Sequence, residues 1–370
     1  MSLLTLTLFI AGFVLLVYGA ELLVRGASKL ALAAGISPLV IGLTVVAYGT
    51  SAPELAVSVQ SSFAGVADIA VGNVVGSNIA NVLLILGISA VIAPLMVSIQ
   101  LVRLEVPLMI ALSVLVLLLG WDGRIGRVDG LLFFAGGLVY TIVTIWQSRR
   151  ETAARQKEQS IDPIDEQSPA GAKQITFQLG LIVSGLVLLV IGANWLVNGA
   201  VVIATHFGVS ELIVGLTIVA IGTSLPEMAT SLVASLRGER DIAVGNIVGS
   251  NIFNILIVLG LSGAISPTGL EVSRSALSFD IPVMIAVAFA CLPVFFTGNV
   301  IARWEGVLFL GYYLAYVAYL ILNATQQPIL PAFNWAMMIF VIPLTTVTLV
   351  ISIIWAWHQR IDTHVPTSKI

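Results

Sequence analysis

The sequence predicts an all-α polytopic membrane protein made of two inverted five-helix repeats, with ten core helices and an eleventh transmembrane helix near the C-terminus. The composition, a series of long apolar stretches and an internal repeat lead to this prediction. Of the 370 residues, 58% are hydrophobic and 9% are charged, whereas soluble domains carry about 25% charged residues. So few charges cannot cover a water-exposed surface, and the expected surroundings are a lipid bilayer.

Eleven apolar stretches are each long enough to cross a hydrocarbon core of about 30 Å as a helix, which satisfies its own backbone in lipid. The first stretch has spanning length and no basic residues before it, which favours a retained helix over a cleaved signal peptide. The predicted spans are residues 3–25, 37–63, 68–93, 102–120, 128–147, 175–199, 208–236, 241–265, 278–297, 302–323 and 333–357.

A polar segment divides these spans into two groups. Residues 148–174 are rich in charged side chains, contain two prolines and show no apolar periodicity, which is typical of a linker. The expected organisation is a first transmembrane repeat over residues 1–147, a cytoplasmic linker over 148–174, a second inverted repeat over 175–323, and an extra helix and tail over 324–370.

The basic residues predict the orientation of the helices. If the N-terminus lies outside, about thirteen Lys and Arg fall in the inside loops, and only Arg124, Arg127 and Arg274 fall in the outside loops. Because basic residues concentrate in cytoplasmic loops, the sequence predicts an outside N-terminus and a cytoplasmic C-terminus.

The second half of the chain copies the first at a constant shift. GLTVVAYGTSAPE at 42–54 returns as GLTIVAIGTSLPE at 215–227, and DIAVGNVVGSNIAN at 68–81 returns as DIAVGNIVGSNIFN at 241–254. About 30 of 48 aligned positions are identical without a gap, which chance does not supply. Five predicted helices separate each segment from its copy, and an odd number reverses the direction through the bilayer. Such inverted repeats are typical of secondary transporters with a site near the membrane midplane.

Glu54 and Glu227 are the strongest candidates for function, because a carboxylate deep in an apolar span is costly and usually functional. In each copy, four residues at helical spacing form one stripe that ends on the glutamate. The stripes comprise Ala47, Thr50, Ser51 and Glu54 in the first copy, and Ala220, Thr223, Ser224 and Glu227 in the second. Their hydroxyl and carboxylate oxygens are the ligands that Ca²⁺ and other hard cations require.

Pro53 and Pro226 predict that both of these helices are broken beside the stripe. Proline removes an amide donor and clashes with the carbonyl four residues before it. A break at membrane depth frees backbone carbonyls to face a cavity. Ala47 and Ala220 have no polar side chain, so we expect them to contribute through their carbonyls.

The following helix in each copy supplies a second row of oxygens. The rows are Asn73, Ser77 and Asn81 in the first copy, and Asn246, Ser250 and Asn254 in the second. Glycines four residues apart on the same helices permit close approach of a neighbouring helix. Asn73, Asn78, Asn246 and Asn251 suit interhelical hydrogen bonds as well as they suit ion ligands.

The charge of the candidate site limits what it carries. Two carboxylates are neutralised by one Ca²⁺ or two Na⁺, and an unpaired buried charge costs several kcal/mol. Competition between these ions for shared oxygens is a basis for exchange. A single cysteine, three His at or beyond span ends and a net charge of -3 favour neither a zinc site nor a nucleic-acid partner. No resident cofactor is expected, and the acids lack the His or Lys partner that an intramembrane hydrolase would need.

The repeated segments resemble the alpha repeats of the sodium/calcium exchanger family, within the cation/Ca²⁺ antiporter superfamily. The residues that carry the resemblance are GTSAPE at 49–54 with GNVVGSN at 72–78, and GTSLPE at 222–227 with GNIVGSN at 245–251. The likeness covers about the first 323 residues and is strongest to the compact prokaryotic branch. The eleventh helix departs from the ten-helix pattern of that branch.

The resemblance implies a secondary antiporter of the prokaryotic plasma (inner) membrane that exchanges Na⁺ for Ca²⁺ by alternating access through four adjoining sites. It assigns Glu54 and Glu227 to both ions, joined by the hydroxyls of Thr50, Ser51, Thr223, Ser224, Ser77 and Ser250. Ala47 and Ala220 would supply carbonyls to Na⁺, and Asn81 and Asn254 would line the centre. Some relatives carry Asp at the Asn254 position. In this sequence both central positions are Asn, so the centre of the site has no third acid.

Two alternatives remain at this point. A Ca²⁺/H⁺ antiporter would use protonation of Glu54 and Glu227 in place of Na⁺, although that branch more often carries further acids in the helix that holds Ser77. A passive cation channel would also use oxygen-lined helices, but it would show no counterflow.

Overall fold

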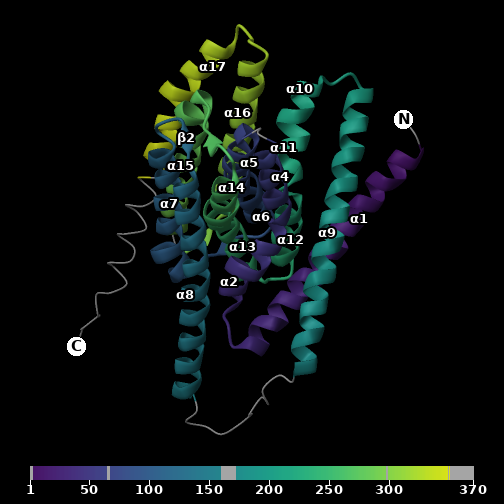
Figure 1. Ribbon diagram of the computed structural model, residues 1–370, viewed down its shortest axis with the longest axis vertical. Helices are drawn as coiled ribbons and strands as arrows, with labels where there is room; N and C mark the ends of the chain where they lie inside the picture. The colour runs from purple at the N-terminus through teal and green to yellow at the C-terminus, as the bar shows by residue number, and fades with distance from the viewer. Residues whose placement is uncertain (1–2, 65–66, 160–171, 297–298, 349, 351–370) are drawn as a thin grey trace, which may run out of the picture.

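The computed structural model describes residues 3–64, 67–159, 172–296, 299–348 and 350, and Figure 1 shows its arrangement. Within these residues the secondary structure is helical apart from four two-residue strands. Nine of the described helices are long and apolar enough to cross a membrane, or ten if the bent pair Pro38–Thr50 and Ala52–Phe63 is one span. The chain is therefore an all-helical, multi-pass integral membrane protein.

The two halves contain the same series of elements. The first half comprises α1 (Leu3–Ala34), α2 (Pro38–Ile41), η1 (Gly42–Val46), α3 (Ala47–Thr50), α4 (Ala52–Phe63), α5 (Ala67–Ala80), η2 (Asn81–Leu86), α6 (Gly87–Ile92), η3 (Leu101–Glu105), α7 (Val106–Leu119) and α8 (Arg127–Gln159). The second half comprises α9 (Ala172–His206), α10 (Glu211–Val214), η4 (Gly215–Val219), α11 (Ala220–Gly222), α12 (Leu225–Leu236), α13 (Arg240–Phe253), η5 (Asn254–Leu259), α14 (Gly260–Ile265), η6 (Ala276–Asp280), α15 (Ile281–Phe296) and α16 (Arg303–Ala324). The π-helical turns η1, η2 and η3 recur as η4, η5 and η6.

The helix breaks predicted at Pro53 and Pro226 are confirmed. Helix α4 begins directly after Ser51 and is bent by 47° from the preceding helix. Helix α12 begins after a turn at Thr223 and Ser224. Three of the other helices end later than predicted: α1 continues to Ala34, α8 to Gln159 and α9 to His206. The start of the predicted polar segment is therefore helical. The rest of that segment lies mostly outside the described residues.

The centre of the molecule is the continuous helical stretch α13–η5–α14. Every residue from Ile242 to Leu259 is buried. A helix that is buried on all sides belongs to the core of a large bundle, so its polar side chains must find partners inside the protein. The polar residues of α13 are therefore the natural starting point for a site.

Helices α1 and α9 lie side by side along one edge of the bundle, as Figure 1 shows. Glycines at equivalent positions bring their backbones together. A Cβ added to Gly12 would lie 2.8 Å from the Gly192 carbonyl oxygen, and one added to Gly19 would lie 2.8 Å from that of Gly185. Small residues at a membrane-helix interface permit such close backbone packing.

Two short antiparallel strand pairs connect the halves. Strand β1 (Leu95–Met96) pairs with β4 (Val300–Ile301), and β2 (Arg124–Ile125) pairs with β3 (Leu270–Glu271). Each pair takes one strand from each half. The halves are thus joined by backbone hydrogen bonds as well as by side-chain packing.

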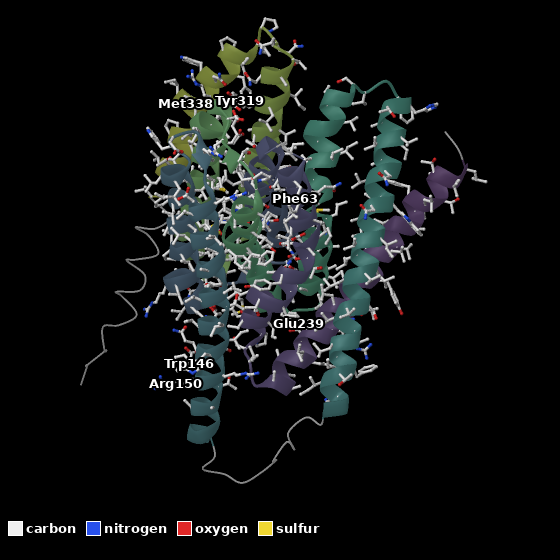
Figure 2. All side chains as sticks on the ribbon, in the orientation of Figure 1. Phe63, Trp146, Arg150, Glu239, Tyr319 and Met338 are labelled. Carbon is white, nitrogen blue, oxygen red and sulfur yellow. The ribbon has the colours of Figure 1, made fainter. Side chains whose placement is uncertain are left out.

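The last described helix lies at the periphery, as expected of a helix outside the repeat. It comprises α17 (Leu330–Ala336), η7 (Met337–Val341) and the residues up to Thr348, and none of its best membrane-spanning window is buried. Tyr312 on α16 donates to Thr345 Oγ1 at 2.7 Å. An apolar cavity of about 520 Å³ separates this helix from α15 and α16; Tyr319 and Met338, labelled in Figure 2, are among its lining residues.

The α1–α9 packing predicts that Gly19→Val destabilises the protein. The new side chain would meet the backbone of Gly185 and Leu189, and overpacking of this kind costs about 1–3 kcal/mol. The control is Gly180→Val on α9, because no described atom lies within 4 Å of a Cβ at that position. Thermal unfolding in detergent should show a lower midpoint for Gly19→Val only. Equal midpoints would show that α1 and α9 do not need this contact.

Candidate functional site

The helix breaks place both glutamates at the beginning of a helix. Pro53 and Glu54 lie in the first turn of α4, and Pro226 and Glu227 in the first turn of α12. The N-terminal end of a helix, where backbone amides are free, carries partial positive charge, which stabilises a nearby carboxylate. Each break thus turns a residue that would lie mid-helix in a continuous span into one at a helix N-terminus.

Each glutamate is hydrogen-bonded by the serine of the other copy. Ser51 Oγ donates to Glu227 Oε1 at 2.7 Å, and Ser224 Oγ donates to Glu54 Oε1 at 3.2 Å. Both carboxylates are 1% exposed. Ser77 joins this group, since its Oγ lies 3.3 Å from that of Ser224. The two broken helices therefore meet head to head at one buried centre.

Asn73 and Asn246 hold the backbone around the two glutamates. Asn73 Nδ2 donates to the Glu54 carbonyl at 3.1 Å and to Ser58 Oγ at 2.9 Å. Its Oδ1 accepts from Thr223 Oγ1 of the other copy at 3.4 Å. Both amide ends of Asn73 are thereby used in joining helices, which favours the structural interpretation of this residue.

The second copy repeats this arrangement. Asn246 Nδ2 donates to the Glu227 carbonyl at 3.4 Å and to Ser231 Oγ at 3.0 Å. Thr50 Oγ1 donates to Asn246 Oδ1 at 3.2 Å. Thr50 and Thr223 are therefore brought to the site, but each points to an asparagine of the opposite copy.

Four asparagines connect the two central helices across the site. Asn81 Nδ2 donates to Asn251 Oδ1 at 3.0 Å, and Asn254 Nδ2 donates to Asn78 Oδ1 at 3.0 Å. Asn81 and Asn254 are also the first residues of the π-helical turns η2 and η5. A π-helical turn changes the direction of the side chains along a helix and is frequent at functional sites. Asn78 and Asn251 thus hold the amides of the predicted central pair in place.

Several buried oxygens at this centre have no hydrogen-bond partner among the described residues. A buried acceptor without a partner costs about 1–3 kcal/mol, so a site that keeps several of them is suited to a ligand that supplies positive charge. These atoms are Glu54 Oε2, Glu227 Oε2, Asn81 Oδ1, Asn254 Oδ1 and Ser250 Oγ. All of them belong to residues that the sequence singled out.

The predicted carbonyl ligands Ala47 and Ala220 differ between the copies. Ala47 is fully buried, and its carbonyl accepts from the Ser51 amide at 3.0 Å. Ala220 is exposed, and the Ser224 amide donates instead to Ile221 at 3.0 Å. The same sequence motif therefore has two backbone conformations in this structure.

A third acid, Glu105, lies near the start of a predicted span, where the sequence favours an interfacial position, but the structure buries it. It is fully buried at the end of η3, where Tyr140 donates to Oε2 at 2.8 Å and Gln100 to Oε1 at 3.3 Å. Asp280 at the end of η6 accepts from Tyr316 at 3.0 Å in the equivalent way. The signal that could have revealed these pairs is the recurrence of an acid near the start of the fourth and ninth predicted spans and of a tyrosine within the span that follows each.

Comparison with known proteins identifies the family. The family model described as "Sodium/calcium exchanger protein" matches residues 4–146 and 177–322, which is most of the chain. The chain belongs to the sodium/calcium exchanger family. It is therefore a member of a family of cation antiporters and not of a family of enzymes.

Curated members of the sodium/calcium exchanger family cover nearly the whole length of the repeats. The inner membrane protein YrbG of Escherichia coli is 39% identical over 86% of this chain and 97% of its own length. The sodium/calcium exchanger MaX1 of Methanosarcina acetivorans is 34% identical over 84% of this chain and 96% of its own length. A solved structure of the sodium-calcium exchanger NCX_Mj aligns with a TM-score of 0.73 at 30% identity, covering 86% of this chain and 99% of that one.

The helices around the candidate site are packed tightly in one copy and loosely in the other. A Cβ on Gly42 would lie 2.8 Å from the Ile242 carbonyl oxygen, and one on Gly249 would lie 2.6 Å from the Leu43 backbone. A Cβ at the equivalent positions Gly215 and Gly76 would meet no described atom within 4 Å apart from the backbone of its own helix. The segment α2–η1–α3 is thus closed against α13, whereas α10–η4–α11 is open against α5.

The geometry predicts that Ca²⁺ raises the melting temperature of the protein and that Glu54→Gln or Glu227→Gln abolishes this rise. An ion at 100 times its dissociation constant stabilises the folded protein by about 2.7 kcal/mol. Either substitution removes one of the two carboxylates that would bind the ion. Glu105→Gln is the matched control, because that buried acid is hydrogen-bonded outside the site. The measurement is intrinsic fluorescence during heating with and without Ca²⁺. An undiminished rise in both site variants would place the ion elsewhere.

Proposed function

We propose that this protein is a secondary antiporter that exchanges Na⁺ for Ca²⁺ at the centre between its two copies. The observation that carries the proposal is the crossed pairing of Ser51 with Glu227 and of Ser224 with Glu54, which leaves one oxygen of each carboxylate unpartnered. The proposed ligands are the glutamates, the hydroxyls of Thr50, Ser51, Ser77, Thr223, Ser224 and Ser250, the amide oxygens of Asn81 and Asn254, and the carbonyls of Ala47 and Ala220. MaX1 is named a sodium/calcium exchanger, which supports this choice of ions.

Charge balance supports the exchange of one divalent ion for monovalent ions. Among the described residues, no group of three or more His, Cys, Asp or Glu side chains is arranged to hold a metal. The two glutamates therefore supply the whole negative charge of the proposed site. One Ca²⁺ or two Na⁺ neutralises it, and because burial makes uncompensated charge costly, the two occupancies should exclude one another.

The proposed architecture is two inverted five-helix repeats over residues 1–147 and 175–323, joined by a cytoplasmic linker over 148–174 and followed by the extra helix and tail over 324–370. The proposed orientation in the plasma membrane has the N-terminus outside, because the basic residues then lie in the cytoplasmic loops. In that orientation the open face beside Gly72, Gly76 and Gly215 points outward. The closed face beside Gly42, Gly245 and Gly249 points to the cytoplasm.

The different packing of the two copies supports alternating access. Copies of nearly equal sequence can exchange their conformations, so the closed segment α2–η1–α3 and the open segment α10–η4–α11 represent the two forms that each copy adopts. If they exchange, the central site becomes open to the opposite side while the ligands stay the same. Ions shift this equilibrium only by binding the two states differently.

Flux through reconstituted vesicles tests the proposed ions. Ca²⁺ uptake should occur when Na⁺ is loaded inside the vesicles. It should fall to the level of vesicles without the protein when the internal Na⁺ is replaced by K⁺. A protonophore should leave Na⁺-driven uptake in place. Uptake that ignores Na⁺ and stops when a pH gradient is collapsed would instead support Ca²⁺/H⁺ antiport at Glu54 and Glu227. Uptake down the Ca²⁺ gradient without any counterion would support a channel.

Substitution of the acids tests the site within the same flux assay. Glu54→Gln or Glu227→Gln should abolish Na⁺-driven Ca²⁺ uptake, because one positive charge of the cargo then has no counter-charge. Glu105→Gln serves again as the buried-acid control and should retain uptake. Elution as a single folded species in detergent separates loss of transport from misfolding. Uptake at the unsubstituted rate in either site variant would refute the assignment.

A further inference from the structure

The broken helix of the first copy is hydrogen-bonded to α8 at two points. The Tyr48 hydroxyl on α3 bonds to Thr141 Oγ1 on α8. Thr141 gives its own hydrogen to the Gly137 carbonyl at 2.8 Å, so Tyr48 is the donor of the first bond. At the residue before α2, the Ser37 amide donates to Ser148 Oγ at 2.9 Å. We call the bonds Tyr48–Thr141 and Ser37–Ser148 the α8 tether.

Helix α16 is the counterpart of α8, and matching contacts fix the residue correspondence. The Asp129 carboxylate accepts from the Gly126 amide at 2.8 Å, as that of Glu305 accepts from the Ala302 amide at 2.7 Å. Farther along the two helices, Tyr140 and Tyr316 each donate to the acid that ends η3 or η6. The contacts at both points give the same alignment of α8 with α16.

The second copy lacks the chemistry to form an equivalent tether. The alignment places Val317 opposite Thr141 and Ala324 opposite Ser148. The sequence repeat places Ile221 opposite Tyr48. None of these three side chains has a hydrogen-bonding atom. The two copies thus share their ion ligands but differ in how the broken helix is anchored.

The α8 tether connects α2–η1–α3, which is closed against α13, to α8, which packs closely on α14 and η5. Helix α8 packs on α14 and η5, where a Cβ on Gly130 would meet the backbone of Gly263 and one on Gly137 would meet Ile257. These elements continue α13, against which α2–η1–α3 is closed. The Tyr48 ring also lies on Phe253, the last residue of α13, with centroids 4.3 Å apart. Movement of the broken helix away from α13 would therefore break the tether.

We propose that the α8 tether is a positioning device that favours the state seen here, with the first broken helix closed and the second open. The inference rests on the alternating access of the proposed function but not on the identity of the ions. Because the second copy has no counterpart of the tether, the two end states differ in free energy although their ligands are equivalent. The protein accordingly rests with one particular face of the site open.

Cysteine labelling measures the two states directly. Ala47 is fully buried here, whereas its repeat partner Ala220 is exposed. A water-soluble thiol reagent should therefore label Ala220→Cys quickly and Ala47→Cys slowly in detergent-solubilised full-length protein without transported ions. The native Cys291 is fully buried, and the parent protein gives its background.

Removal of the Tyr48–Thr141 bond of the tether should raise the labelling rate of Ala47→Cys by about three- to tenfold, the factor expected for one side-chain hydrogen bond. Tyr48→Phe and Thr141→Val should each have this effect, and the double variant should match the single ones because all three remove the same bond. Labelling of Ala220→Cys should slow or stay constant. Tyr312→Phe is the matched control, because it removes a Tyr–Thr bond of the same kind, to Thr345, far along the chain from either broken helix.

The outcomes separate the tether from the transport proposal. Unchanged labelling of Ala47→Cys in folded Tyr48→Phe and Thr141→Val variants would overturn the tether, even if Na⁺-driven Ca²⁺ uptake is observed. An equal increase in Tyr312→Phe, or independent effects of the two tether variants, would also overturn it. An increase specific to the tether variants would support it even if the flux assay finds another pair of ions.

Discussion

The interruption of two membrane helices by proline is the constraint on which the site depends. Pro53 and Pro226 lie in the first turns of α4 and α12, where proline needs no amide donor, so Glu54 and Glu227 lie in the first turn of a new helix in the interior of the bundle. The serine before each break lies at the same turn and reaches the acid of the other copy. A continuous helix would carry the same residues but would not bring the two first turns together.

Burial of two carboxylates without a basic partner gives the site its chemistry. The ion pair found among the described residues joins Arg237 to Glu21, away from the centre. The glutamates instead receive neutral hydroxyl donors, each on one oxygen, and their other oxygens are left without a protein partner. In a dry interior such oxygens are satisfied best by a cation, which is why we propose this centre as the ion site.

Near-identity of the two copies at the site contrasts with their different packing around it. The asparagine, serine and glutamate contacts recur almost residue for residue, yet Gly249 is in close backbone contact while Gly76 has free space around it. Nearly the same sequence motif therefore occurs in two helix arrangements within one structure. We propose that differences between the copies, such as Tyr48 against Ile221, decide which arrangement each copy adopts.

The sequence alone determined the membrane class, the repeated unit and the two helix breaks, and it singled out the glutamates and serines that meet at the candidate site. These features follow from local chemistry: apolar length, duplication at a fixed spacing, and the missing amide of proline. Only the tertiary structure decided which side chains meet. Ser51 bonds to Glu227, 176 residues away, rather than to its neighbour Glu54, and Ala47 is buried while Ala220 is exposed. The spacing of residues in the sequence places them on one face of a helix. The packing of helices that lie far apart in the sequence decides which residues that face contacts.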